Sequence, residues 1–325
     1  DAASRLMEAL PCIEDIWFEA RYPIVTAHYV EPEIPLEVKM RAFSPFVPLN
    51  AKDSGLPVVL LILEAENHGS SEVEASFLAS LQNAVGWDGV GQIEGVDWEG
   101  YGGNRNRIIR TDGLTALLMD RLGGEPSSRG DGEMVLAALS GEATAKPQWA
   151  GVDDLWRDFE DDGSLTPSEP RPSPVGSTWN GALSLNRTLR PGDFWRCTFL
   201  VTWFFPNRYV DWDQSGLGVV RDSNPVKIGN MYANWFGSAL DVARYASRNY
   251  DRLVSETESF VECFYSSSLP EAVLDAASAN ISTIRTPTCF WAQDANFYGF
   301  EGCCGESTTH CKLSGCCPLN CTHVW

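Results

Sequence analysis

The stretch that decides the fold is LPVVLLILEAEN, residues 56–67. Its apolar run from Val58 to Leu63 follows Pro57 and is the longest in the chain. A membrane-spanning helix needs about 20 apolar residues, so this run is far too short to cross a bilayer and predicts no integral membrane segment. A short apolar run that begins after a proline is typical of a buried strand.

The sequence on both sides of this run contains further short extended patterns, separated by Pro, Asn and Gly at strand spacing. They are IWFEARYPIVTAHYV (16–30), LEVKMRAFSPFVP (36–48) and EVEASFLASLQNAV (72–85). More strands are predicted at Asn106–Thr111, Thr115–Met119, Met134–Leu139 and Asp193–Phe205. Such a succession is typical of an antiparallel sandwich or barrel.

The apolar period changes near the end of the chain. From Gly229 onward apolar residues recur every three to four positions, which predicts one long helix with an apolar stripe from Tyr232 to Val254. A second helix is expected to open at SLPE, where Ser268 and Glu271 have capping-box spacing. Because strands come first and helices after, we expect two domains packed side by side, a β-sandwich over 1–225 and a helical part over 226–325.

An acidic and Pro-rich loop is expected over 141–178, with one short helix at VDDLWRDFEDDG (152–163). Six residues of this loop match a calcium-loop template closely: Asp158, Glu160, Asp162, Gly163, Thr166 and Glu169. Glu160 replaces the usual Asp or Asn at the third position, and Pro167 stands where an exiting helix should start. These two departures favour a solvated acidic turn.

The charge balance limits the partners. The chain has 44 acidic and 24 basic residues, a formal net charge of −20, and no long basic run. A nucleic-acid partner requires a positive stripe, and an anionic membrane surface attracts basic segments, so both are disfavoured. The composition instead favours a neutral or cationic substrate.

The tract FYGFEGCCGESTTHCKLSGCCPLNCTHVW, residues 297–325, holds six of the ten cysteines. Four of them have zinc-ligand spacing, with His310 and His323 nearby: Cys311, Cys316, Cys317 and Cys321. Adjacent cysteine pairs cannot easily all face one ion, so a loop held by disulfides or by packed thiols competes with a structural zinc site. We therefore expect no cofactor, with zinc as the weaker alternative.

Two residue types in this sequence could contact a sugar. Glu301, within GFEG, could act as a catalytic carboxylate, but a glutamate in this context also caps turns or pairs with arginine. Tryptophans near glycine-rich loops could stack on a sugar face, although burial is the usual role of tryptophan. They are Trp87, Trp98, Trp291 and Trp325.

Five stretches, in this order, resemble glycoside hydrolase family 116, the family of bacterial and archaeal β-glucosidases and of the animal non-lysosomal glucosylceramidase. They are EVKMRAFSPFVPLNAKDSGLPVVLLILEAEN (37–67), DLWRDFEDDGSL (154–165), TFLVTWFFPNR (198–208), SLPEAVLDAASANISTIRTPTCFW (268–291) and FYGFEGCC…CTHVW (297–325). The resemblance implies an N-terminal antiparallel β-sandwich followed by the opening helices of an (α/α)6 toroid whose funnel holds the sugar.

The resemblance also implies a retaining β-glycosidase that acts on β-glucosides. The family nucleophile, a glutamate before a glycine, corresponds to Glu301 in FEG, and His323 in NCTH stands at the position of an aspartate that helps hold the sugar in the animal members. The family's acid/base aspartate lies downstream of residue 325, so we expect this polypeptide alone to be a fragment without useful glycosidase activity. The alternative is a non-catalytic carbohydrate-binding or scaffolding sandwich with a cysteine-rich structural module.

Overall fold

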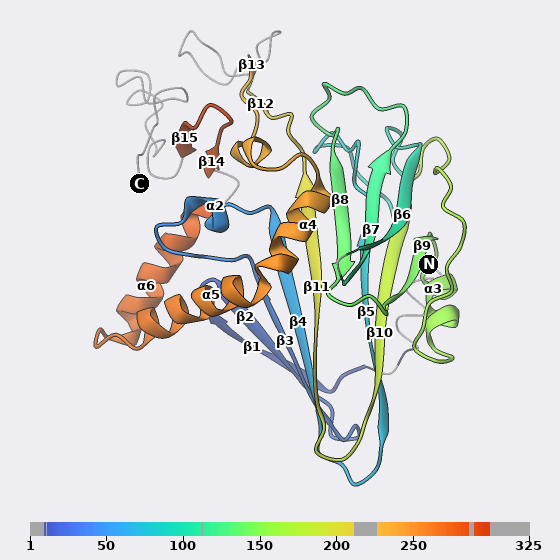
Figure 1. Cartoon of the computed structure of the whole chain (residues 1–325), viewed down its shortest axis with the longest axis vertical. Helices are drawn as coiled ribbons and strands as arrows, with labels where there is room; N and C mark the ends of the chain where they lie inside the picture. Colours follow the sequence, from blue (N-terminus) through green and yellow to red (C-terminus); the bar gives the residue numbers. More distant parts are fainter. Residues whose placement is uncertain (1–9, 11, 112, 211–225, 286–288, 300–325) are drawn as a thin grey trace.

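The computed structural model describes residues 10, 12–111, 113–210, 226–285 and 289–299 (Figure 1). Its main feature is an eight-stranded sheet in which all neighbouring strands are antiparallel. The strand order is β1 (Asp15–Arg21), β2 (Ile24–Val30), β3 (Leu36–Phe43), β4 (Val58–Asn67), β11 (Phe194–Phe204), β8 (Glu133–Ala138), β7 (Leu114–Arg121) and β6 (Asn104–Thr111). The expected antiparallel strands of the N-terminal region are thus confirmed.

A smaller sheet packs on one face of the large one. Its three antiparallel strands lie in the order β5 (Val73–Gln82), β10 (Asn180–Leu189) and β9 (Thr144–Trp149). The core between the two sheets contains Leu117, Leu136, Leu183 and Phe199, each at most 1 % exposed. This packing makes the strand region a β-sandwich.

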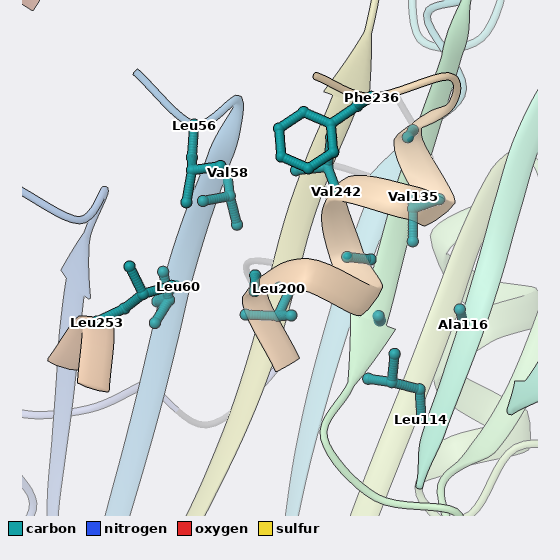
Figure 2. Packing of buried hydrophobic residues seen from close by; sticks show 14 of the residues in the cluster. Leu56, Val58, Leu60, Leu114, Ala116, Val135, Leu200, Phe236, Val242 and Leu253 are labelled. Carbon is teal, nitrogen blue, oxygen red and sulfur yellow. The ribbon is translucent and has the colours of Figure 1, made fainter. Parts of the chain in front are cut away.

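Helices α4 (Ala239–Arg248) and α5 (Tyr250–Tyr265) cover the opposite face of the large sheet (Figure 1). Figure 2 shows Val242 of α4 and Leu253 of α5 pointing toward the strands, with Leu253 beside Leu60 of β4 and Leu200 on β11. All four side chains are fully buried. The molecule therefore has three layers, and the central strands of its large sheet are covered on both faces.

The decisive stretch forms β4, and its pattern follows from these layers. Val58, Leu60 and Ile62 are fully buried in the helix-facing core, while Leu61 and Leu63 pack in the core between the sheets. A strand covered on both faces is apolar at successive positions instead of alternating with polar residues. The predicted buried strand is confirmed.

The predicted single helix from Tyr232 to Val254 is wrong. The structure has a 3-10 turn, η1 (Met231–Asn234), and two α-helices that meet at Asn249, whose φ of −108° and ψ of 13° are not helical. The C-terminal end of α4 and the start of α5 both use this residue as a cap. The periodic stripe is real, but the chain turns at Asn249 within it.

The predicted capping box at Ser268 and Glu271 is also wrong. Helix α6 (Glu271–Ser282) has Pro270 at its N-cap and no side-chain cap hydrogen bond. Glu271 is thus the first helical residue, whereas a capping box needs it at the third. The short acidic helix is confirmed as α3 (Val152–Phe159).

The remaining short elements lie at one end of the large sheet (Figure 1). They are α2 (Ala51–Ser54), the pair β12 (Tyr209–Val210) and β13 (Val226–Lys227), the 3-10 turn η2 (Thr283–Arg285), and the hairpin β14 (Cys289–Trp291) and β15 (Phe297–Gly299). The predicted boundary between 225 and 226 and the predicted toroid stay predictions. Within the described ranges, no helix is both long and apolar enough to pass through a membrane.

Candidate functional site

A cavity of about 570 Å³ lies where α2, η1, η2 and the β14–β15 hairpin meet. Five aromatic side chains contribute to its wall: Tyr232, Trp235, Phe290, Trp291 and Phe297. Its volume is within the range of about 300–1,000 Å³ that small-molecule sites occupy. The aromatic wall makes this cavity the candidate binding site among the described residues.

Two tryptophans form the most distinctive part of the wall. The rings of Trp235 and Trp291 meet edge to face, with centroids 5.4 Å apart and an interplanar angle of 73°. The indole Nε1 of Trp291 donates to the carbonyl of Ala295 at 3.1 Å, which fixes the ring plane relative to its own hairpin. A fixed indole pair offers flat apolar surface to a ligand at little entropic cost.

Backbone and side-chain contacts hold the hairpin on η1 and on the segment that precedes it. The amide of Gln293 donates to the Ile228 carbonyl at 3.0 Å, and the Asn234 side-chain amide donates to the Gln293 carbonyl at 2.8 Å. Gly229 has φ +63°, and a Cβ at that position would lie 2.4 Å from the Gln293 side chain. Only glycine fits this close approach without strain.

Arg285 fastens η2 to the loops around α2. Its guanidinium donates to the carbonyls of Ser44 at 3.0 Å, Ser54 at 2.6 Å and Pro45, and it lies 5.2 Å from the ring centroid of Phe46. Burial lowers the pKa of Arg285. These contacts place Arg285 in the cavity wall as an anchor between segments that lie far apart in the sequence.

Asp53 connects α2 to the helices that cover the sheet. It accepts hydrogen bonds from Tyr245 at 2.7 Å and from Arg252 at 2.7 Å, and its side chain is 2 % exposed. Burial opposes its charge and is the largest influence, yet the bonds from Arg252 and Tyr245 outweigh it, so the pKa of Asp53 lies below its usual value. The α2 side of the cavity is thus held by a buried ionic contact.

Asp53→Asn is expected to lower the free energy of unfolding by about 1–2 kcal/mol at neutral pH, a value reduced because Arg252 is 38 % exposed. Because the folded pKa is depressed, this stabilisation is complete above the ordinary value of 3.8 and is lost as the pH falls through the folded value. Urea unfolding between about pH 7 and pH 3 should show the two proteins converging in acid. Asp251→Asn, on an exposed position of α5, is the control. A stability difference that is constant over this range would contradict the assignment.

The described part of the cavity wall offers aromatic surface for binding but contributes no carboxylate. Of the described residues around the cavity, none is Asp or Glu. Glu301, His323 and the zinc candidates Cys311, Cys316, Cys317 and Cys321 lie outside the described residues. In the sequence, Glu301 follows the end of β15 by two residues, so the predicted carboxylate comes directly after the hairpin that forms the aromatic wall.

The acidic loop does not gather its carboxylates. Asp158 accepts hydrogen bonds from Lys146 at 3.2 Å and from the Thr166 amide at 3.0 Å, and Asp162 accepts one from the Ser164 amide at 2.8 Å. Over the ranges that the structure covers, no three His, Cys, Asp or Glu side chains are grouped to hold a metal ion. The side chain of Asp158 is therefore used within the loop.

Sequence reasoning singled out Trp291 but missed Trp235 and Tyr232 as wall residues. Both belong to the apolar stripe that predicts a helix, and an apolar residue at helical spacing is usually core. Of the other tryptophans considered, Trp87 donates to the Gly91 carbonyl at 2.8 Å and Trp98 packs against Tyr101, and neither lines the cavity.

Comparison with known proteins gives one family match. A family model described as beta-glucosidase 2, glycosyl-hydrolase family 116 N-term, matches residues 6–253. The match begins before β1 and runs through α4 into α5, so it includes both sheets and the first helices of the covering layer.

Two solved structures show distant similarity. A protein assigned as a kojibiose phosphorylase from the human microbiome is 11 % identical, with a TM-score of 0.37 over 77 % of this chain and 25 % of that one. A protein assigned as an aldose 1-epimerase from Klebsiella pneumoniae subsp. pneumoniae MGH 78578 is 10 % identical, with a TM-score of 0.24 over 58 % and 53 % of the two chains. This chain thus spans about a quarter of the first protein and half of the second, and TM-scores this low carry no argument about fold or function.

Proposed function

This chain belongs to glycosyl-hydrolase family 116, and from that membership we propose that it forms part of a retaining β-glucosidase whose nucleophile is Glu301. The proposal rests above all on the cavity with its aromatic wall, part of which is formed by the hairpin that immediately precedes Glu301 in the sequence. The matched model describes the N-terminal part of the family. In this proposal the second carboxylate lies downstream of residue 325, in the helical toroid that completes the site.

The aromatic wall suits a neutral sugar. A pyranose ring carries apolar C–H faces and a polar rim, and sites for such ligands combine aromatic surface with a few placed polar groups. Trp235 and Trp291 supply the aromatic surface, and two polar residues, Asn230 and Asn296, line the same cavity. An uncharged ligand also fits a chain with a net charge of −20 better than an anionic one.

Retaining hydrolysis uses two carboxyl groups about 5–5.5 Å apart. In the proposed mechanism, ionised Glu301 attacks the anomeric carbon and the bond to the leaving oxygen breaks, which gives a glycosyl-enzyme. The second carboxyl group, protonated at the start, donates its proton to the leaving oxygen and then takes a proton from the water that releases the sugar. In the sequence, Gly299 and Gly302 lie on either side of Glu301, and glycine has no side chain to hinder an approaching substrate.

Trp291→Ala is expected to raise KM for an aryl β-glucoside about 3- to 10-fold in the active enzyme that contains this chain, with a smaller change in kcat. The loss corresponds to about 0.5–1.5 kcal/mol of aromatic contact with the sugar. Initial rates over a range of substrate concentrations measure both constants, and NMR of the first product should show the β-anomer.

Trp156→Ala is the matched control for this variant. Trp156 lies on α3, also packs against a second aromatic ring, and does not line the cavity. It should leave KM unchanged. An equal increase in KM in both variants would show that the cavity is not the sugar site. Release of α-glucose as the first product would contradict the retaining mechanism.

A further inference from the structure

Strand β1 forms an exposed edge of the large sheet (Figure 1). All seven of its residues are exposed, including Ile16 at 42 %, Trp17 at 49 % and Phe18 at 66 %. Natural proteins usually protect an apolar edge strand, because its unpaired backbone groups are a template for another strand. An edge with this many exposed apolar side chains therefore indicates an interaction surface.

The hairpin shows which backbone groups of β1 are directed away from β2. Arg21 pairs with Ile24 across a two-residue loop, and the pair that closes such a loop is hydrogen-bonded within the hairpin. Odd-numbered residues of β1 therefore direct their amide and carbonyl groups to β2. Ile16, Phe18 and Ala20 direct theirs outward. In agreement with an outward direction, the amide of Ile16 donates to the carboxylate Oδ1 of Asp15, the preceding residue in the same strand, at 2.9 Å.

The sequence of β1, DIWFEAR, is complementary to itself when read in the opposite direction. If two copies align antiparallel about Phe18, Phe18 faces the partner's Phe18 and Ile16 faces the partner's Ala20. These are the residues with outward backbone groups. At each end of the strand pair, Asp15 of one copy lies opposite the partner's Arg21. Each end therefore has an acidic side chain facing a basic one. Opposite charges in directly facing positions stabilise a strand pair.

We propose that β1 is the contact between two copies of this chain, which pair antiparallel about a twofold axis at Phe18 and join their large sheets into one continuous sheet. Three facing pairs each exchange two backbone hydrogen bonds, about six in all, and the Ile16 amide gives up its bond to Asp15 to form one of them. Twofold contacts between identical patches are the commonest form of homo-oligomer.

The side chains of β1 agree with this arrangement. By their register with β2, Ile16 and Phe18 lie on the sheet face that carries Tyr29 and Ala27. At the axis the two Phe18 rings meet on this face, and each Ile16 packs beside the partner's Ala20. On the other face the Trp17 ring stacks on His28, with centroids 3.6 Å apart, beside the partner's Glu19. The contact covers a single strand, so we expect a dimer that dissociates on dilution.

Sedimentation velocity of the 325-residue chain between about 1 and 100 µM tests the proposal. Wild type should shift from monomer to dimer as concentration rises, and Phe18→Asp should raise the dissociation constant at least about tenfold, because it places two carboxylates together at the axis. Phe194→Asp is the matched control, since Phe194 is 49 % exposed on β11 inside the same sheet. Circular dichroism should show both variants folded.

Charge reversal tests the register. Asp15→Arg and Arg21→Asp should each weaken the dimer, while the double variant should restore it, because the two facing ends again carry opposite charges. Arg21 also pairs with Glu19 at 2.9 Å, so recovery in the double variant is the decisive result. A monomer at every concentration, a dimer that Phe18→Asp leaves intact, or a double variant weaker than both single variants would each overturn the proposal.

Discussion

Replacing Glu301 with glutamine is expected to lower kcat for an aryl β-glucoside by at least about 10⁴-fold in the active enzyme that contains this chain. Glutamine keeps the size of the side chain but has no charged oxygen to attack the anomeric carbon. Under the proposed mechanism the glycosyl-enzyme then cannot form. Substrate affinity should change far less, because the aromatic wall of the cavity is retained.

A mechanism-based 2-deoxy-2-fluoro-β-glucoside provides an independent readout. It should label a peptide that contains Glu301 in the wild-type enzyme and label no peptide in Glu301→Gln. Glu306→Gln makes the same chemical change five positions downstream and should retain both activity and labelling. Labelling of a peptide elsewhere, or equal loss of activity in the two variants, would remove Glu301 from the nucleophile role.

Leu253→Ala is expected to lower the free energy of unfolding by about 3 kcal/mol. Leu253 is fully buried on α5 and packs in the core that also contains Leu60 of β4 (Figure 2). The smaller side chain loses this buried contact and leaves a cavity between helix and sheet. Because the core is shared, we expect the helices and the sheet to lose stability together, as a single shift of the urea transition.

Leu269→Ala is the matched control, because Leu269 is 53 % exposed in the segment between α5 and α6. It should change stability by less than about 0.5 kcal/mol. Far-UV circular dichroism follows mainly the helices, and tryptophan fluorescence follows the tertiary packing, to which Trp195 and Trp203 of β11 contribute. If Leu253→Ala shifts only the helical signal, the helices and sheet are separate cooperative units.

The strands of this fold could be predicted because their signals are local. The apolar run at Val58–Leu63 predicts a buried strand wherever its partners lie. The order of the strands could not be predicted in the same way. Strand β4 pairs with β11, so Leu61 faces Phe199 across more than a hundred residues of sequence, and only the packing of both cores selects that neighbour.

Two predictions about the helices were wrong because local sequence patterns do not show where a helix begins or ends. The apolar stripe from Tyr232 to Val254 persists across Asn249 because both helices bury residues against the same sheet, and so periodicity alone does not reveal the turn. At α6, the spacing of Ser268 and Glu271 is correct for a cap, but Pro270 takes the N-cap position between them.

The cavity was predicted least well. Trp235 has the spacing of a core residue, and its role follows from Trp291, which reaches it only after the chain has passed through α4, α5 and α6. The nucleophile was assigned from the resemblance of FEG to the family motif, and its place beside the cavity stays a prediction.

The core that α4 and α5 share with the large sheet also determines where this protein can be joined to a relative in a chimera. Exchange of the β-sandwich between relatives at a joint near residue 225 would leave α4 and α5 facing a foreign sheet, with Val242, Ala243, Ala246 and Leu253 matched to the wrong side chains. A joint placed after α5 keeps the covering helices with the strands they evolved beside. Chimeric enzymes built from this family should therefore inherit the sheet and both helices as one block.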